Sequence, residues 1–174
     1  TAMYDQLGDT VSYNIVREHF KLLFATIENH HGVVIKTIGD AVMASFIKTE
    51  DAIKASLEIF QNFLDRIWDP AGKLEIKIGL NKGPVIVVNS NEHLDYFGHH
   101  VNIASRIQSQ LKKHSVGFTE SIFQDRNIKT LLLEFIKQNK ENQQDIKLFR
   151  KRANLKGIQE RIPLYYLTAN KSLQ

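Results

Sequence analysis

The sequence contains no cysteine in its 174 residues, so disulfide scaffolds and thiolate metal sites are excluded. This absence fits a reducing compartment. The sequence also lacks any apolar run close to the roughly 20 residues that a membrane-spanning helix needs. Glu134 interrupts the longest candidate, residues 131–136. No internal repeat and no linker-like run of proline, glycine or serine is present. With the chain length, these absences predict one domain over residues 1–174 with a sizeable core.

The chain also has only a small excess of charge of one sign. Lysine and arginine number 23 against 19 acidic residues, a formal net charge of +4, and the densest basic cluster covers residues 147–156. A surplus of this size favours polyanionic ligands, nucleotides included. It falls well short of the basic stripe expected of a nucleic-acid-binding protein, so we expect no nucleic-acid partner.

The apolar periodicity predicts helices and strands in alternation along the chain. Helices are expected over residues 9–30, 50–68, 98–113 and 120–145, and strands over residues 33–38, 41–46, 74–80, 85–88, 94–97, 116–119, 147–155 and 164–168. This order implies an α+β fold, with an antiparallel or mixed sheet and helices packed on one face.

The dipeptide Gly39–Asp40 is predicted to form a two-residue turn between the strands at 33–38 and 41–46, because glycine tolerates the positive φ of such turns. A carboxylate at a hairpin tip is held by two strands and stays open to a ligand. This suits a hard cation such as Mg²⁺, which takes oxygen ligands and keeps sites for water or phosphate. An ordinary turn aspartate is the alternative reading of Asp40.

A second informative stretch, residues 95–106, introduces a helix. At about 100° per residue, Asn102 and Arg106 stand one turn apart on one side of this helix. The expected apolar side consists of Val101, Ala104, Ile107 and Leu111. An amide and a guanidinium on a rigid face suit ribose oxygens and a phosphate, since arginine offers phosphate a fork of donors. A solvated helix face is the alternative.

Three ordered motifs carry a family resemblance. They are Lys36-x-x-Gly39-Asp40 followed by Phe46, then Asp95-x-x-Gly98-x-x-Val101-Asn102-x-Ala104-Ser105-Arg106, and then Leu155-Lys156-Gly157. Residues 78–85 also look like the Ile-Gly-x-x-x-Gly-x-Val segment of that family. Over nearly its whole length the chain closely resembles the class III adenylate/guanylate cyclase catalytic domain.

The resemblance implies a ferredoxin-like, βαββαβ-type cyclase fold and an activity in intracellular signalling. The implied reaction is conversion of ATP to 3′,5′-cyclic AMP and pyrophosphate, by attack of the ribose 3′-oxygen on the α-phosphorus. It implies two divalent ions per site, Mg²⁺ or Mn²⁺. It also implies a head-to-tail homodimer in which each active site is built across the interface.

The resemblance also supplies residue roles. Asp40 matches a metal-binding carboxylate, while Lys36 and Asp95 match the pair that reads the purine. Lysine can donate to a ring nitrogen of adenine and the carboxylate can accept from its exocyclic amine. Guanylate-specific members carry other residues here, so this pair points to ATP. Asn102 matches the residue that orients the ribose.

Two cationic residues match phosphate-binding positions of the family. Arg106 matches the residue that stabilises charge developing on the α-phosphate. Lys156 matches the lysine that binds the terminal phosphates. In the family, the metal-binding aspartates come from one subunit. The residues for base, ribose and phosphate come from its partner.

The sequence departs from the family pattern at its beginning. The resemblance places a first strand, with a second metal-binding aspartate, just upstream of Thr1, so we expect the 174 residues to be an N-terminally incomplete domain. An N-terminal sensor or membrane module would then precede it, the only expected membrane contact, with the catalytic domain in the cytosol. The alternative hypothesis is a non-catalytic, cyclase-like dimerisation or nucleotide-binding regulatory domain.

Overall fold

The computed structural model describes residues 6–90, 93–158 and 160–169. The chain divides into two compact units, residues 1–75 and residues 76–174, each described here by itself. Among the described residues, no helix is both long enough and apolar enough to cross a membrane.

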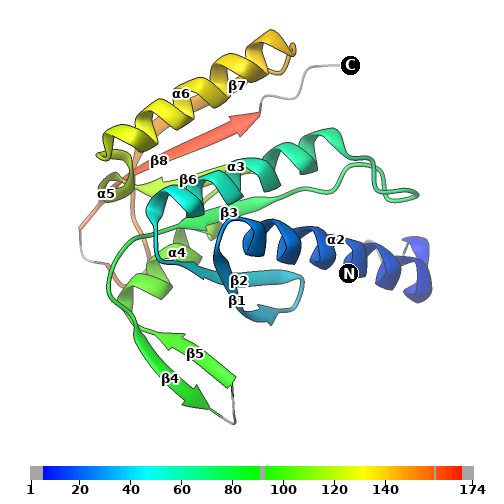
Figure 1. Cartoon of the computed structure of the whole chain (residues 1–174), viewed down its shortest axis with the longest axis horizontal. Coiled ribbons are helices and arrows are strands. Elements are labelled where there is room, and N and C mark those ends of the chain that lie inside the picture. The colour runs from blue at the N-terminus through cyan, green and yellow to red at the C-terminus, as the bar shows by residue number, and fades with distance from the viewer. Residues whose placement is uncertain (1–5, 91–92, 159, 170–174) are drawn as a thin grey trace. The chain divides into compact units, whose positions relative to one another are not determined.

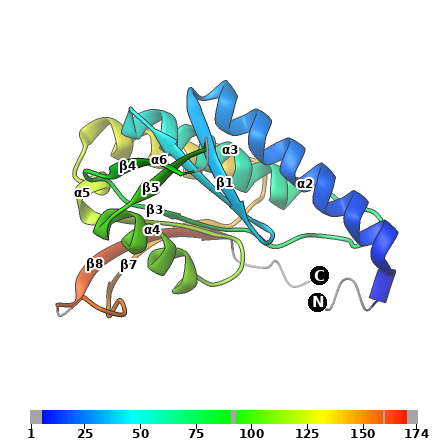
Figure 2. The same ribbon diagram turned by 90° about the horizontal axis from the view of Figure 1, so that it is seen from below.

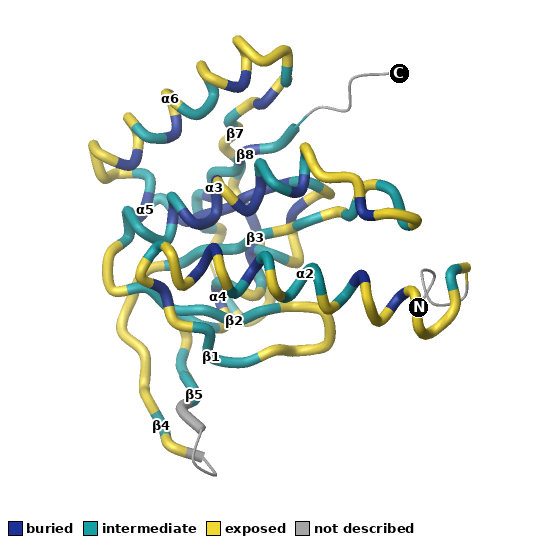
Figure 3. The backbone as a smooth tube through the Cα atoms, turned by 45° about the vertical axis from the view of Figure 1, so that its right-hand side comes forward, coloured by how far each residue is buried: buried dark blue, intermediate teal, exposed yellow. Residues whose placement is uncertain are grey.

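In its described part, the first unit packs helices against a hairpin. Its elements are α2 (Asp9–Asn29), β1 (Gly32–Ile38), β2 (Ala41–Phe46) and α3 (Thr49–Asp65). The strands pair antiparallel around a two-residue turn, which confirms the predicted hairpin. The hairpin lies alongside α2 (Figures 1 and 2). α3 turns an apolar face inward, seen as its buried stripe in Figure 3, and Ile53, Phe60 and Phe63 on this face are each 0% exposed.

The second helix of this unit is shorter than the sequence predicts. We expected it to reach residue 68, but it ends at Asp65, and Arg66 already has extended backbone geometry. Trp68 turns inward, where its backbone N–H donates to the carbonyl of Gly72 at 2.6 Å. The Arg66 guanidinium lies 4.1 Å from the centre of the indole ring. Local turn contacts therefore override the helical periodicity that continues through Ile67, which is 69% exposed.

The second unit is built on a four-stranded sheet. Its elements are β3 (Lys77–Leu80), β4 (Ile86–Ser90), β5 (His93–Phe97), α4 (His99–Ser109), β6 (Ser115–Thr119), α5 (Glu120–Phe123), α6 (Arg126–Glu141), β7 (Ile146–Ala153) and β8 (Ile162–Ala169). The strand order is β3-β6-β8-β7; β3 and β6 run parallel and the other pairs antiparallel. β4 and β5 form a separate two-stranded arm (Figure 1). The predicted α+β class with a mixed sheet is confirmed.

Helices cover both faces of this sheet rather than the one face that the sequence suggested. All five residues of β6 are buried. Gly117 on this strand faces the side chains of Ile107 and Leu111. The next residue, Phe118, points to the opposite face and stacks on Phe123 of α5. The central strand therefore lies between α4 on one face and α5 on the other.

Gly79 of β3 brings the sheet into contact with the backbone of α4. A Cβ atom at this position would lie 2.3 Å from the carbonyl oxygen of Ala104 and 2.6 Å from the backbone nitrogen of Gln108. Backbone atoms of a helix cannot rotate away as a side chain can, so a larger residue must push α4 off the strand.

We expect Gly79→Val to lower the free energy of unfolding by about 1–3 kcal/mol, the usual cost of overpacking a core. Urea unfolding followed by circular dichroism measures this change. Ser105→Ala, on the exposed side of α4, is the matched control and should leave the midpoint almost unchanged. Equal midpoints for Gly79→Val and wild type would contradict the close packing.

Candidate active site

Asp40 lies at the tip of the β1–β2 hairpin. Gly39 before it has φ +62°, which confirms the expected need for glycine in the turn. The Asp40 residue is exposed, and its backbone carbonyl accepts a hydrogen bond from His19 Nε2 at 2.9 Å. The tip is thus fixed through its backbone while its carboxylate faces solvent. The Asp40 carboxylate can therefore act as one ligand of a hard cation, with waters and phosphate oxygens as the others. Within the described part of the chain, no cluster of three or more metal-ligating side chains exists.

His19 is a residue of this region that the sequence reasoning missed. It lies on α2, and burial lowers its pKa, an effect that the Asp40 carbonyl and carboxylate only partly oppose. The imidazole is therefore neutral near pH 7. Because a carbonyl only accepts, Nε2 must carry the ring hydrogen. The interaction joins residues 21 positions apart, so periodicity in either segment gives no sign of it.

Lys36 is placed by a β-bulge in β1. Val34 pairs with Ala44 and Lys36 pairs with Met43, so Ile35 is the extra residue between two neighbouring partners. Directly paired residues share a face of a sheet, and neighbouring residues on β2 face opposite ways. The bulge therefore turns Lys36 to the face opposite Val34, although residues two positions apart in a regular strand share a face. Bulges often re-aim a side chain in this way next to functional sites.

The helix α4 carries Asn102 and Arg106 away from its buried side, as predicted. Asn102 is exposed and Arg106 is half-buried. The buried side differs in one respect from the expectation: Ile103, at 8% exposure, and Ile107, at 0%, form its centre, while Val101 and Ala104 are only half-buried. The centre of the buried side is therefore displaced from the predicted face toward Ile103.

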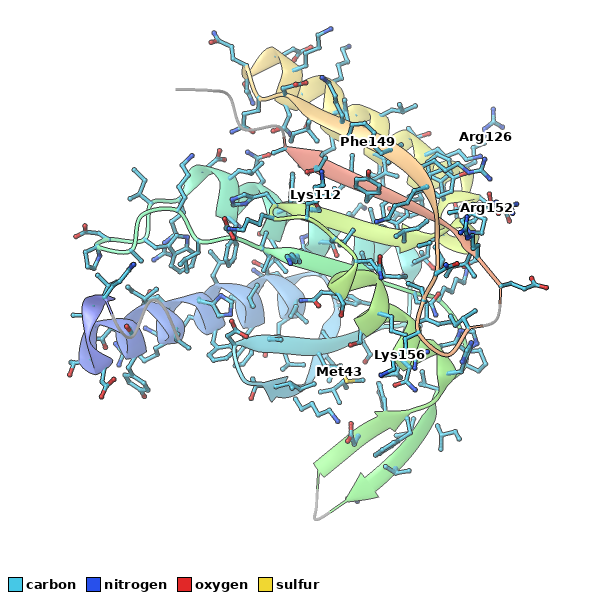
Figure 4. The ribbon with its side chains drawn as sticks, turned by 180° about the vertical axis from the view of Figure 1, so that it is seen from behind. Met43, Lys112, Arg126, Phe149, Arg152 and Lys156 are labelled. Carbon is cyan, nitrogen blue, oxygen red and sulfur yellow. The ribbon has the colours of Figure 1, made fainter. Side chains whose placement is uncertain are left out.

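Arg106 lies against the loop between β7 and β8. Its guanidinium nitrogens are 3.4 Å from where a Cβ of Gly157 would stand. Lys156, the neighbour of this glycine, is exposed on the same loop, next to α4 (Figure 4). The structure therefore brings the two predicted phosphate-binding residues into one region of the second unit.

A small apolar cluster holds this loop against α4. Ile103 and Ile107 of the helix pack with Leu155, which is 2% exposed and directly precedes Lys156. Ala153 and Leu164 complete the buried cluster from β7 and β8. Because one cluster anchors both the helix and the loop, the separation of the two cationic residues is set by core packing rather than by flexible surface segments.

Asp95 lies on β5, opposite Val88 of β4. It is half-buried, and its Oδ1 accepts a hydrogen bond from the backbone N–H of Tyr96 at 2.8 Å. This contact orients the carboxylate. Asp95 therefore belongs to the second unit with Asn102, Arg106 and Lys156, whereas Lys36 and Asp40 belong to the first.

A polar network that the sequence did not reveal fixes the start of α4. The amide Nδ2 of Asn81 donates to the backbone carbonyl of His100 at 3.1 Å. It also lies 3.1 Å from the ring Nδ1 of His100. The hydroxyl of Thr119 donates to Asn81 Oδ1 at 3.0 Å, and the His100 ring packs on Gly83. The segment after β3 thus ties α4 to β6, which gives residues 78–85 a structural role.

Comparisons with known proteins agree with this fold. The family model described as the adenylate and guanylate cyclase catalytic domain matches residues 1–168. An adenylate cyclase from Anabaena cylindrica is 25% identical over 186 residues, covering 97% of this chain and 34% of the relative. An uncharacterized Mycobacterium tuberculosis protein is 28% identical over 107 residues, 62% of this chain and 26% of that protein. The chain thus spans about a quarter to a third of the length of these curated relatives.

Solved structures bear out the predicted cyclase fold. An adenylate cyclase from Trypanosoma brucei, studied in its monomeric state, superposes with a TM-score of 0.76 at 18% identity, covering 95% of this chain and 83% of that one. A guanylate cyclase domain from Catenaria anguillulae in complex with GTP gives a TM-score of 0.74 at 20% identity, with coverages of 98% and 90%.

Proposed function

The chain belongs to the adenylate and guanylate cyclase catalytic domain family, and we propose that it converts ATP to 3′,5′-cyclic AMP and pyrophosphate. The observation that carries this proposal is the packing of the Arg106 guanidinium against Gly157, beside Lys156. Two cationic groups on a rigid frame suit the α- and terminal phosphates of a nucleoside triphosphate. We also propose a cytosolic location for the domain, which its lack of cysteine supports.

In the proposed reaction, the ribose 3′-oxygen loses its proton and bonds to the α-phosphorus, while the bond from that phosphorus to the departing pyrophosphate breaks. Asn102 orients the ribose, Arg106 stabilises charge on the α-phosphate and Lys156 holds the leaving pyrophosphate. Fixed groups of this kind contribute through positioning and preorganised charge. Asp40 would hold divalent ions, Mg²⁺ or Mn²⁺, which when bound acidify the 3′-hydroxyl and neutralise phosphate charge.

We propose that the protein acts as a head-to-tail homodimer with two shared sites. The β4–β5 arm and the residue before it expose apolar side chains: Val85 at 40%, Ile86 at 65%, Val87 at 53% and Phe97 at 52%. Ile86 and Phe97 are direct partners across the arm and share one of its faces, and exposed apolar side chains grouped in this way are typical of an interaction surface. A second copy of the chain would cover this arm. Asp40 of one protomer would then meet Asn102, Arg106 and Lys156 of the other.

The direct test is product identification. Full-length protein incubated with ATP and Mg²⁺ or Mn²⁺ should release cyclic AMP and pyrophosphate in equal amounts, as resolved by chromatography and mass spectrometry. GTP should be converted more slowly. Absence of any cyclic nucleotide from a folded, dimeric sample would contradict the proposal.

Lys36 and Asp95 are proposed to select adenine. Lysine donates to a ring nitrogen and aspartate accepts from the amine, whereas guanine presents an acceptor oxygen where adenine has its amine. Lys36→Glu should therefore lower ATP turnover and relax the preference for ATP over GTP. Initial rates with each nucleotide measure the ratio. Lys48→Glu, the same charge change at an exposed position of the first unit, is the control. An unchanged ratio in Lys36→Glu would show that this residue does not read the base.

A further inference from the structure

The ring of His19 lies where α2, α3 and the hairpin tip meet. It makes edge contacts with Phe20, at 5.0 Å between ring centres, and with Phe63 of α3, at 5.7 Å. Phe63 is 0% exposed. Two helices therefore hold the imidazole in place, and its Nε2 reaches the Asp40 carbonyl from this fixed position.

The hydrogen bond from His19 restrains the peptide group that follows Asp40. A two-residue turn has few internal contacts. β1 ends at Ile38 before it, and β2 begins at Ala41 after it. An external donor on the Asp40 carbonyl limits rotation of this peptide. It therefore limits the directions in which the Asp40 side chain can project. The restraint acts on the backbone and leaves both carboxylate oxygens available to a ligand.

We propose that His19 is a positioning residue that holds the Asp40 turn in the conformation that binds a divalent cation. The inference rests on the proposed cyclase function and adds a residue outside the motifs of the family resemblance. Groups that orient a metal ligand commonly affect metal affinity although they do not touch the ion. His19 would act in this way through the carbonyl of the ligand residue.

Two substitutions at His19 distinguish the contribution of its hydrogen-bond donor from that of its aromatic ring. His19→Phe keeps an aromatic ring between Phe20 and Phe63 but removes the donor, whereas His19→Gln retains an N–H donor of similar reach. Loss of one neutral hydrogen bond should weaken Mn²⁺ binding about fivefold in His19→Phe, and His19→Gln should restore most of it. Binding is measured on full-length protein by electron paramagnetic resonance titration of Mn²⁺ with a non-cyclisable ATP analogue. His19→Leu replaces the phenylalanine variant if that variant does not fold.

Backbone hydrogen exchange gives a second readout that needs neither metal nor nucleotide. The amides of residues 38–41 should exchange about fivefold faster in His19→Phe, because the lost restraint lets the turn open more often. His30→Phe is the matched control. His30 lies at the C-terminal end of α2, away from the turn, and its Nε2 lies 2.7 Å from a carboxylate oxygen of Glu58. This substitution should change neither exchange in the turn nor Mn²⁺ affinity.

The outcomes distinguish this inference from the function on which it rests. Mn²⁺ binding that depends on Asp40 but is equal in His19→Phe and wild type would overturn the inference alone. Equal weakening in His19→Phe and His30→Phe, or unchanged exchange at residues 38–41, would also overturn it. Wild-type protein that neither binds Mn²⁺ nor cyclises ATP would overturn the proposed function, and the inference with it.

Discussion

Asp40→Ala is expected to abolish metal-supported cyclic AMP formation, with a fall of at least about 100-fold, because a lost ligand costs more than the orienting groups around it. The fold should survive. The Asp40 carboxylate is exposed, and the contact with His19 uses the backbone carbonyl, which alanine retains. The free energy of unfolding should change by no more than about 0.5 kcal/mol, as for most surface substitutions. Initial rates across a Mg²⁺ and a Mn²⁺ series, with thermal unfolding of the same samples, measure both effects.

Glu28→Ala is the matched control for this experiment. Glu28 is another exposed carboxylate of the first unit, near the end of α2. Its removal should leave both the turnover and the metal requirement at wild-type values. Retained turnover with an unaltered metal requirement in Asp40→Ala would exclude Asp40 as a metal ligand.

Mixing two inactive variants is expected to restore activity. Asp40→Ala and Arg106→Ala should each be nearly inactive alone, since loss of one group that stabilises transition-state charge costs ~10²–10³ in rate. In a heterodimer with shared sites, one site carries both lesions and the other carries none. Random pairing makes half of the dimers heterodimers, each with one intact site of two, so activity should recover to about a quarter of the wild-type value.

Dilution and co-purification provide the controls for the mixing experiment. Activity of the mixture and of wild type should fall more steeply than in proportion to protein concentration, because sites exist only in the dimer. Mixing Asp40→Ala with Lys36→Glu tests the same arrangement differently. Both residues lie on one hairpin, but in a shared site they would come from different protomers. A heterodimer would therefore again carry both lesions in one site and none in the other, and activity should again recover. If heterodimers are shown to form and Asp40→Ala with Arg106→Ala restores nothing, the shared-site arrangement is wrong.

The sequence predicts the hairpin well because its signals are local. Short apolar, β-rich runs define both strands, and Gly39–Asp40 defines the turn, so the structure reproduces the tip within a residue. The outward placement of Asn102 and Arg106 is equally local, since it follows from helical spacing alone. The roles of the six candidate residues stay predictions, and the variants at Lys36, Asp40 and Arg106 test three of them.

Other features depend on contacts between distant segments and have no local signal. The bulge at Ile35 looks like an ordinary strand residue in the sequence, because only its pairing with β2 reveals it. Asn81 is fixed by His100 and Thr119, 19 and 38 positions away. The packing of Arg106 on Gly157 likewise depends on a cluster drawn from α4, β7 and β8. Periodicity cannot specify such partners, so the support around the site emerges only from the folded chain.

The bulge in β1 also bears on how such domains diverge in descent. A bulge is one residue of extra length, so one codon inserted or deleted can create or remove it. Loss of the codon for Ile35 would leave Val34 opposite Ala44 and Lys36 opposite Met43, so Lys36 would keep its face and Gly39–Asp40 would still join the same two strands. The length of β1 can therefore change by one residue in descent without displacing the positions proposed to bind the base and the metal. Two otherwise similar genes that differ by a single in-frame gap here can still encode the same arrangement of these two side chains.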